Sequence, residues 1–191
     1  LKYLRGDAYS AEHWADLFRL LSLEKGMSIE TMLFDQLIEK AEMAINNRDE
    51  IKALNARAQG EISIREALAE LDMWGASSQY STSDYKDAKG RNVKLIKDWK
   101  DLIGKVGDNR SLLQSLKDSP FYKGFVDKAS LWETRLSDLD IILGFLQTVQ
   151  RKWVHLEPIF GRGALPKEQA RFDAINSDFQ QIMSDVERDD R

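Results

Sequence analysis

The chain has 191 residues, of which 42% are hydrophobic and 31% are charged, and it contains no cysteine. The length fits one domain or two small ones, and the missing cysteines exclude disulfides, thiolate metal sites and cysteine nucleophiles. A net charge of −4 gives no general attraction to nucleic acid or anionic lipid, and no apolar run approaches the roughly 20 residues of a membrane-spanning helix. Because the sequence starts at Leu1 rather than Met, we expect a piece of a longer protein.

Two helices are predicted near the start of the chain. Ser10 is a suitable N-cap for the first, and Gly26 is expected to end it because glycine tolerates positive φ. Ser28 is expected to cap the second. The apolar face of the second helix would consist of Leu33, Phe34, Leu37, Ile38 and Ala41.

A long helix is predicted after a break at Asn46-Asn47, since asparagine favours turns. This helix would run from about residue 49 to residue 74. Gly60 lies in its interior, where glycine costs about 1 kcal/mol relative to alanine. We therefore expect tertiary packing to compensate if the helix is continuous.

The middle of the chain changes from helical spacing to alternation. Residues 77–97 predict a β-hairpin with a turn at Asp87-Ala88-Lys89-Gly90. A lone hairpin is marginal in water, so we expect it to lie on the helices. Helix is expected to resume near Val93 and end at Gly104, and Asp108 is expected to cap a short helix after it.

The clearest periodicity follows Ser119-Pro120, a helix start signal. Its apolar residues step by three and four, which predicts a long helix over 120–157 packed lengthwise on partner helices. Pro158 is expected to stop it, and Leu165-Pro166 to open a last helix. The apolar stripe consists of Tyr122, Phe125, Ala129, Trp132, Leu136, Leu139, Leu143 and Leu146, continued by Val149 and Trp153 in shifted phase. The last helix would use Phe172, Ile175, Phe179, Ile182 and Met183.

The search for catalytic motifs finds none. Gly104-Lys105 lacks the earlier glycine of a P-loop, and Gly161-Arg162-Gly163 lacks the third glycine of a dinucleotide fingerprint. His13 and His155 have no metal-pair spacing, and packing or surface exposure is the simpler interpretation of both. The five tryptophans fit a core, with a docking surface as the alternative. We predict no catalytic, cofactor-binding or metal-binding residue in this chain.

The run from Gln150 to Phe160 resembles the linker signature of dynein heavy chains, in which a QRxW-x-x-LE-x-IF pattern precedes an LP-x-E segment. The spacer Gly161-Arg162-Gly163-Ala164 is short, as in the cytoplasmic dynein 2 type, and His155 replaces the usual aromatic residue. The residues that match the signature are Gln150, Arg151, Trp153, Leu156, Glu157, Ile159, Phe160, Leu165, Pro166 and Phe172.

The resemblance implies a mechanical role. Such a linker is an arched helical rod that lies across a ring of AAA+ modules and swings as ATP is turned over, without hydrolysing ATP itself. The implied partners are the AAA+ ring and the tail of the same heavy chain, with a second heavy chain as a further candidate and the microtubule reached only through the full motor. ATP and Mg²⁺ would bind in the ring. The implied setting is retrograde intraflagellar transport in the cytoplasm and the cilium or flagellum.

We predict a mainly α fold, an elongated helical bundle rod with one small β-hairpin. Its parts would be an N-terminal helical part (1–76), the hairpin (77–97) and a C-terminal helical part (98–191). Glu157, Pro158, Gly161 and Gly163 are candidate hinge residues, with an ordinary helix–helix turn as the alternative. The competing functions are a static helical scaffold or tethering module and, third, an enzyme.

Overall fold

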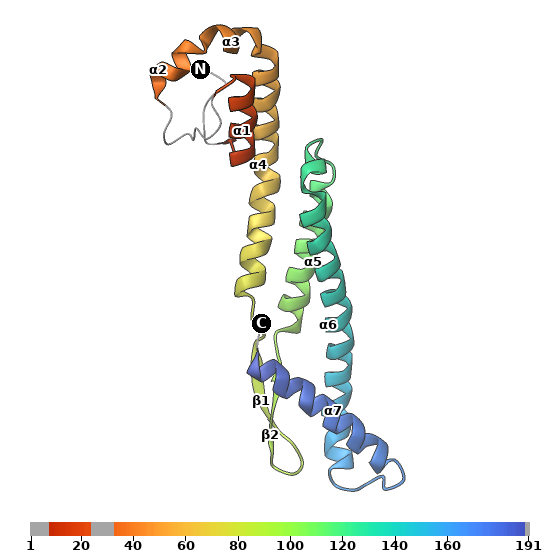
Figure 1. Cartoon of the computed structure of the whole chain (residues 1–191). Coiled ribbons are helices and arrows are strands. Elements are labelled where there is room, and N and C mark those ends of the chain that lie inside the picture. The colour runs from red at the N-terminus through yellow and green to blue at the C-terminus, as the bar shows by residue number, and fades with distance from the viewer. Residues whose placement is uncertain (1–7, 24–32, 190–191) are drawn as a thin grey trace. The chain divides into compact units, whose positions relative to one another are not determined.

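The fold is mainly α with one β-hairpin, which confirms the predicted class (Figure 1). The computed structural model describes residues 8–23 and 33–189. The chain divides into a first compact unit, Leu1–Ala67 with Leu116–Val126, and a second, Leu68–Ser115 with Asp127–Arg191. The three-part division drawn from the sequence stays a prediction. No helix in the described residues is both long and apolar enough to cross a bilayer.

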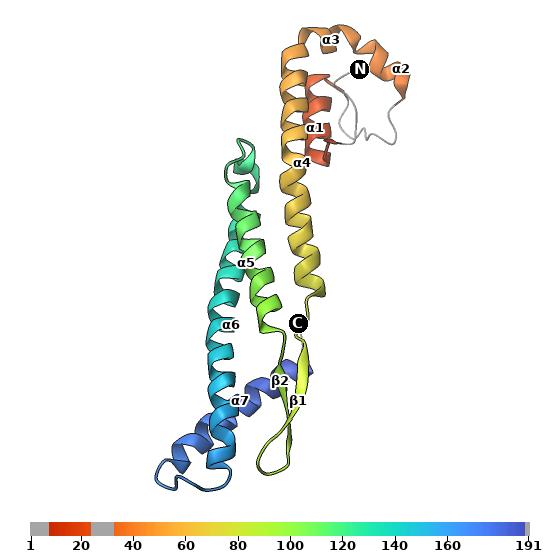
Figure 2. The ribbon, with the colours of Figure 1, turned by 180° about the vertical axis from the view of Figure 1, so that it is seen from behind.

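In the first unit, helix α1 (Ala11–Leu20) packs on the N-terminal half of helix α4 (Arg48–Ser77), as Figure 2 shows from behind. Ser10 is the N-cap, as predicted, and His13 completes a capping box with it. The helix ends at Leu20. The predicted signals at Gly26 and Ser28 lie outside the described residues. The buried core consists of Ala8, Tyr9, Leu17, Leu21, Ile51, Leu54 and Ala58.

Two short helices, α2 (Phe34–Glu39) and α3 (Ala41–Asn46), replace the single second helix of the prediction. Because the chain breaks at Lys40, the expected apolar face does not line up, and both Leu33 and Ile38 are exposed. The side chains of Phe34 and Leu37 are not among those described. The predicted break at Asn46-Asn47 is confirmed, since α4 begins at Arg48. There the Asn47 amide donates to the Leu20 carbonyl at 2.7 Å.

Helix α4 passes through Gly60 without interruption, and a close approach explains the glycine. A Cβ at Gly60 would lie 2.1 Å from Cε2 of Phe121, so only glycine accommodates the ring. The Phe121 N–H donates to Ser119 Oγ at 3.3 Å, which fixes the turn that carries the ring. Packing of Phe121 on α4 is therefore the compensation that the sequence called for.

The second unit contains the predicted hairpin. Strands β1 (Thr82–Lys86) and β2 (Asn92–Ile96) pair antiparallel, with Thr82 opposite Ile96 and Lys86 opposite Asn92. The turn is also confirmed. In the turn, the buried Asp87 carboxylate accepts from the N–H groups of Lys89 and Arg91, and Gly90 takes a φ of 77°.

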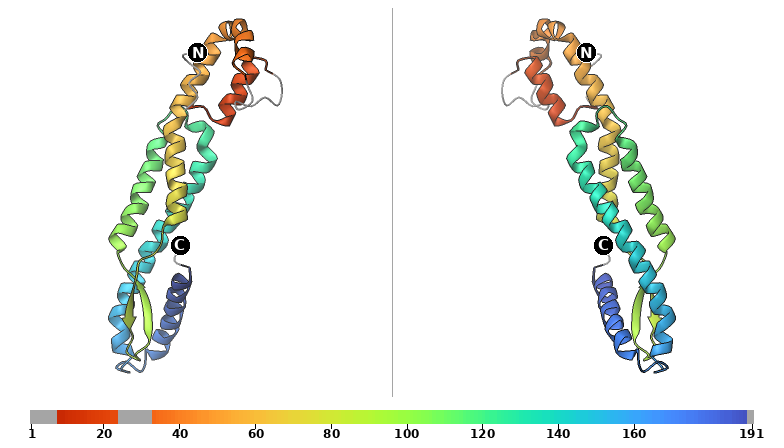
Figure 3. Two further views of the ribbon diagram at one scale, coloured as in Figure 1. Left: turned by 90° about the vertical axis from the view of Figure 1, so that its left-hand side faces the viewer. Right: turned by 90° about the vertical axis from the view of Figure 1, so that its right-hand side faces the viewer.

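The hairpin lies on the helices, as expected, between the C-terminal end of α6 (Val126–Phe160) and α7 (Gln169–Arg188) (Figure 3). The apolar core between these elements is shared by all three. Its buried members are Val93, Leu95, Ile96, Trp153, Phe160, Phe172, Phe179 and Met183.

Several predicted helix ends are wrong. Helix α5 is continuous over Trp99–Leu116, so Val93 belongs to strand β2 and Asp108 lies inside the helix instead of capping one. Val106 and Leu113 hold this helix on one buried face, while Asp108 is exposed on the other side. The local capping signal is overruled by that continuous face.

The ends of α6 and α7 differ from the prediction as well. A short 3-10 helix, η2 (Tyr122–Phe125), leads into α6, which includes Pro158 and runs on to Phe160. A proline in the last turn removes only one backbone hydrogen bond, and the Gly161 N–H closes the end on the Glu157 carbonyl at 2.8 Å. Helix α7 begins at Gln169, after Leu165-Pro166, and exposes Ile175 and Ile182.

Candidate functional site

The signature residues divide between two faces of the molecule. Gln150, Trp153, Glu157 and Phe160 step by three, four and three along α6 and are all buried against the hairpin and α7. We call these four residues, with Phe172 of α7, the α6 junction. The other five signature residues are exposed: Arg151, Leu156, Ile159, Leu165 and Pro166.

Gln150 pairs with the backbone of strand β2. The Ile96 N–H donates to Gln150 Oε1 at 3.0 Å, and Gln150 Nε2 donates to the Ile96 carbonyl at 2.7 Å. The side chain thus satisfies both polar groups of one buried residue, as a neighbouring strand would. This contact joins α6 to the hairpin without using a charge.

Trp153 is the centre of the junction and is almost fully buried. Its indole N–H donates to Asn176 Oδ1 of α7 at 2.9 Å. Its ring packs edge-on against Tyr85 of the hairpin, with centroids 5.4 Å apart. It also packs at a tilt of 33° against Phe179 of α7, with centroids 4.8 Å apart. One side chain therefore contacts both neighbouring elements.

Glu157 is a buried carboxylate that receives hydrogen bonds from the hairpin. The Ala88 N–H donates to Oε1 at 2.8 Å, and the Tyr85 hydroxyl donates to Oε2 at 3.3 Å. Burial, followed by the charge of Glu157, raises the pKa of Tyr85, so the hydroxyl stays protonated and remains a donor. Gly161, just after the end of α6, also lies close against the hairpin turn. A Cβ at Gly161 would lie 2.3 Å from Cβ of Ala88.

Phe160 and Phe172 close the junction across the loop between α6 and α7. Their rings are stacked, with centroids 4.4 Å apart and an interplanar angle of 5°. Within this loop Gly163 has a φ of 70°, a conformation that favours glycine. The hinge suggested for Glu157, Pro158, Gly161 and Gly163 stays a prediction, although Glu157 is hydrogen-bonded to the hairpin turn and Gly161 lies close against it.

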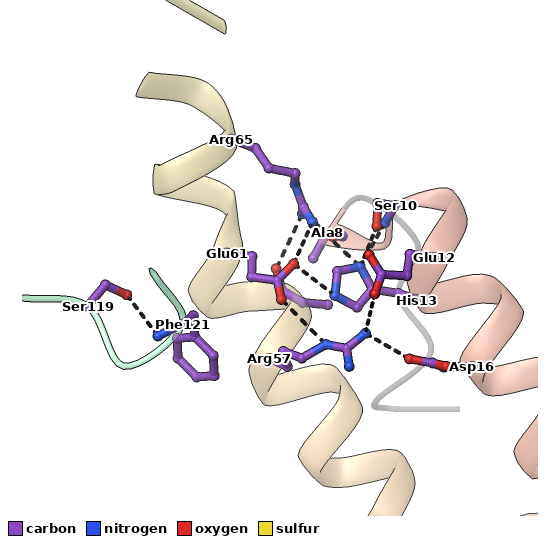
Figure 4. Close-up of polar contacts among 11 residues, drawn as sticks. Ala8, Ser10, Glu12, His13, Asp16, Arg57, Glu61, Arg65, Ser119 and Phe121 are labelled. Atoms are coloured by element: carbon purple, nitrogen blue, oxygen red, sulfur yellow. Dashed lines mark hydrogen bonds and ion pairs between the residues drawn. The ribbon is translucent and has the colours of Figure 1, made fainter. Parts of the chain in front are cut away.

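A second polar arrangement surrounds His13 in the first unit, and the sequence reasoning missed it (Figure 4). His13 is fully buried, and its Nδ1 accepts from the Ser10 N–H at 3.1 Å. Nε2 therefore carries the proton and lies 3.1 Å from Glu61 Oε2, without the alignment of a hydrogen bond. Because Glu61 is 48 positions away along the chain, only the Ser10-x-x-His13 capping spacing signalled the role of His13.

Two arginines complete this His13 cluster, which we define as His13, Glu61, Arg57, Arg65 and Asp16. Arg57 contacts Asp16 at 2.8 Å and Glu61 at 3.4 Å, and Arg65 donates to the Ala8 carbonyl at 2.5 Å. Burial lowers the pKa of His13, Arg57 and Arg65 lower it further, and Glu61 and Glu12 oppose the shift. The cluster holds α1 on α4 through charges. In the residues that the structure describes, no three side chains gather as metal ligands.

The comparisons with known proteins agree on one family. The sequence profile described as "Dynein heavy chain, N-terminal region 2" matches residues 1–191. The chain is 57% identical over 191 residues to cytoplasmic dynein 2 heavy chain 1 of Rattus norvegicus and 56% identical to that of Homo sapiens, covering 100% of this chain in each case. It is 43% identical to the protein of the same name from Chlamydomonas reinhardtii, over 96% of this chain.

These relatives are far longer than the chain, which spans 4% of the length of each of these three. The match nevertheless covers all 191 residues, including both the α6 junction and the His13 cluster. The chain therefore belongs to the dynein heavy chain family, within its N-terminal region 2.

Proposed function

We propose that this chain is a segment of the mechanical linker of a dynein motor, of the cytoplasmic dynein 2 type. It would couple ATP turnover in the AAA+ ring to movement of the tail during retrograde intraflagellar transport along microtubules. The observation that carries the proposal is the family match over the whole chain, with 56–57% identity to mammalian cytoplasmic dynein 2 heavy chains.

The α6 junction supports a force-transmitting role. A lever must move as one body, and Gln150, Trp153 and Glu157 each join α6 to another element by a hydrogen bond of 3.0 Å or less. Such contacts resist sliding of α6 along its own axis, since sliding would break all three together. The junction is thus suited to pass a displacement from one element to the next.

The segment itself would bind no cofactor and catalyse no reaction. ATP and Mg²⁺ would bind in the AAA+ ring of the complete heavy chain, and the partners would be that ring, the tail of the same chain and a second heavy chain. Contact with microtubules would be made only by the full motor. We place this motor in the cytoplasm and the cilium or flagellum, associated with the cytoskeleton.

The bend of the lever would lie in the loop after α6. Glu157 is held by the hairpin, so a change of angle between α6 and α7 would be taken up at Arg162 and Gly163. Such a change would also have to open the Phe160–Phe172 stack, which joins the two helices in this structure. Comparing this angle in two nucleotide states of the complete motor tests the hinge. An unchanged angle would leave the loop an ordinary helix–helix turn.

The coupling function is tested in a complete heavy chain carrying Trp153→Ala, compared with Arg151→Ala on the exposed side of the same helix. We expect Trp153→Ala to retain ATP turnover but to lower microtubule gliding velocity several-fold, because the lever would yield under load. Equal velocities for both variants would contradict the lever and favour a static scaffold. Purified residues 1–191 should show no ATP turnover, and measurable hydrolysis would contradict the proposal that the segment is not catalytic.

A further inference from the structure

Helix α6 carries a second, exposed apolar stripe that flanks the buried face of the α6 junction. We call it the outer seam, and it consists of large side chains that are all exposed in the second unit. Phe145 is 71% exposed and Ile142 is 57% exposed. The members of the outer seam are Leu131, Ile142, Phe145, Val149, Leu156 and Ile159.

The spacing of the outer seam is that of a coiled-coil face. From Ile142 the steps are three, four, seven and three residues, so these side chains project from one side of the helix over about 25 Å. An apolar stripe of this kind matches the apolar face of a second helix. A surface helix normally buries its apolar face, whereas α6 leaves this flanking stripe exposed, which is typical of a helix that packs on one more partner.

Charged residues occupy two of the remaining seam positions and define what a partner must offer. Asp138 and Lys152 lie seven residues before and seven residues after Phe145, and both are exposed. Neither has an ion pair within the described ranges 8–23 and 33–189. A helix seated on the outer seam would therefore place a basic residue near Asp138 and an acidic residue near Lys152.

We propose that the outer seam is the docking face for an amphipathic helix of the same heavy chain from outside residues 1–191. The chain spans 4% of the length of its mammalian relatives, so almost the whole polypeptide is available as an intramolecular partner. A tethered segment competes at an effective concentration of the order of millimolar, which favours it over a separate protein. Of the proposed function, this inference requires only that the chain belongs to a dynein heavy chain. It does not require that the segment acts as a lever.

A photocross-linking experiment on the complete heavy chain identifies the occupant. Phe145→p-benzoylphenylalanine and Ile159→p-benzoylphenylalanine place the probe at two seam positions, and a mixture of isotopically light and heavy chains separates intramolecular from intermolecular products. We expect both probes to cross-link within one molecule to a single segment outside residues 1–191. Cross-links to residues 1–191, to a second heavy chain or to another protein, or no cross-link from either probe, would overturn the proposal.

Hydrogen exchange of the same complete chain gives a second measurement. Ile142→Asp places a charge in the seam, and Ser130→Asp places one on the exposed surface of the same helix outside the seam. We expect Ile142→Asp to raise exchange in the cross-linked segment about tenfold and Ser130→Asp to leave it unchanged. Equal exchange in both variants would show that the seam holds no helix. Because ATP-driven gliding is not measured here, failure of the lever function would leave this result intact.

Discussion

The α6 junction and the His13 cluster hold their units together by different physical means. The junction uses stacked rings and hydrogen bonds to backbone groups, with Glu157 as its single charged member. The His13 cluster joins two helices through a histidine, two carboxylates and two arginines. Contacts of the first kind keep their strength over a wide range of pH and salt, whereas those of the second depend on protonation. We therefore expect the stability of the second unit to change less with pH and salt than that of the first unit.

The largest expected effect is at Trp153. Trp153→Ala removes a buried ring that contacts both Tyr85 and Phe179, and it removes one of the two hydrogen bonds that Asn176 Oδ1 accepts. The free energy of unfolding of the second unit should fall by about 3–5 kcal/mol. Denaturant unfolding followed by hydrogen exchange in α7 measures it. Arg151→Ala, on the exposed side of α6, is the control and should change stability by less than about 0.5 kcal/mol. A loss below about 1 kcal/mol for Trp153→Ala would show that the junction does not depend on this ring.

The next largest effect is expected at Gln150, where a substitution tests whether uncharged hydrogen bonds hold α6 on the hairpin. Gln150→Leu keeps the volume of the side chain but leaves the N–H and carbonyl of Ile96 buried without partners. We expect the free energy of unfolding of the second unit to fall by about 2–4 kcal/mol, since each orphaned group costs about 1–3 kcal/mol. The same substitution at neighbouring Gln147, whose side chain makes no hydrogen bond in the described residues, is the matched control. A similar loss at both positions would mean that the pairing with β2 contributes nothing of its own.

Two helical glycines, one in each unit, allow the same substitution to be compared in the two units. Gly60→Ala would bring a Cβ to 2.1 Å from the Phe121 ring, so the ring must move, and we expect a loss of about 1–3 kcal/mol despite the better helix propensity of alanine. Gly104→Ala in α5 meets open space and should stabilise the second unit by up to about 1 kcal/mol. Thermal unfolding of the two variants gives the signs. A gain for Gly60→Ala would show that Phe121 can leave α4 at no cost.

Local sequence signals predicted the elements whose structure is determined by their own residues rather than by packing against other elements. The alternation over residues 82–96 predicted the hairpin, and Asn46-Asn47 predicted the break before α4. The signals failed where packing continues a helix past a local stop. Asp108 has the residue type of a cap, but the buried face of Val106 and Leu113 continues the helix past it. Pro158 lies in the last turn of α6, where it removes only one backbone hydrogen bond.

The candidate site shows the same limit. The resemblance selected ten residues, but it did not show that Gln150, Trp153, Glu157 and Phe160 meet the hairpin while Leu156 and Ile159 face outward. Which residues are buried depends on where α7 and the hairpin pack against α6. That packing is a property of the folded unit and cannot be read from residues 150–160 alone. The His13 cluster was missed for a related reason, because the charges that surround His13 come from α4, at Arg57, Glu61 and Arg65.

The smallest expected effect is the pH dependence of the first unit. Burial lowers the pKa of His13 below its ordinary value of 6.5, so the folded unit holds His13 neutral while the unfolded chain takes up a proton below that pH. The stabilisation is complete above about pH 6.5 and is lost as the pH falls through the folded-state pKa, with a slope of at most about 1.4 kcal/mol per pH unit.

Hydrogen exchange of α1 and α7, corrected for the intrinsic pH dependence of exchange, measures this effect in one sample. Protection of α1 should fall on acidification to about pH 5.5, while protection of α7 should stay constant, because the packed rings and the Trp153–Asn176 hydrogen bond that hold α7 are uncharged. His13→Gln keeps a side-chain acceptor for the Ser10 N–H but cannot be protonated, so it should flatten the response of α1. If α7 lost protection in parallel with α1, the two units would share one titrating contact, and the contrast between the charged cluster and the uncharged junction would fail.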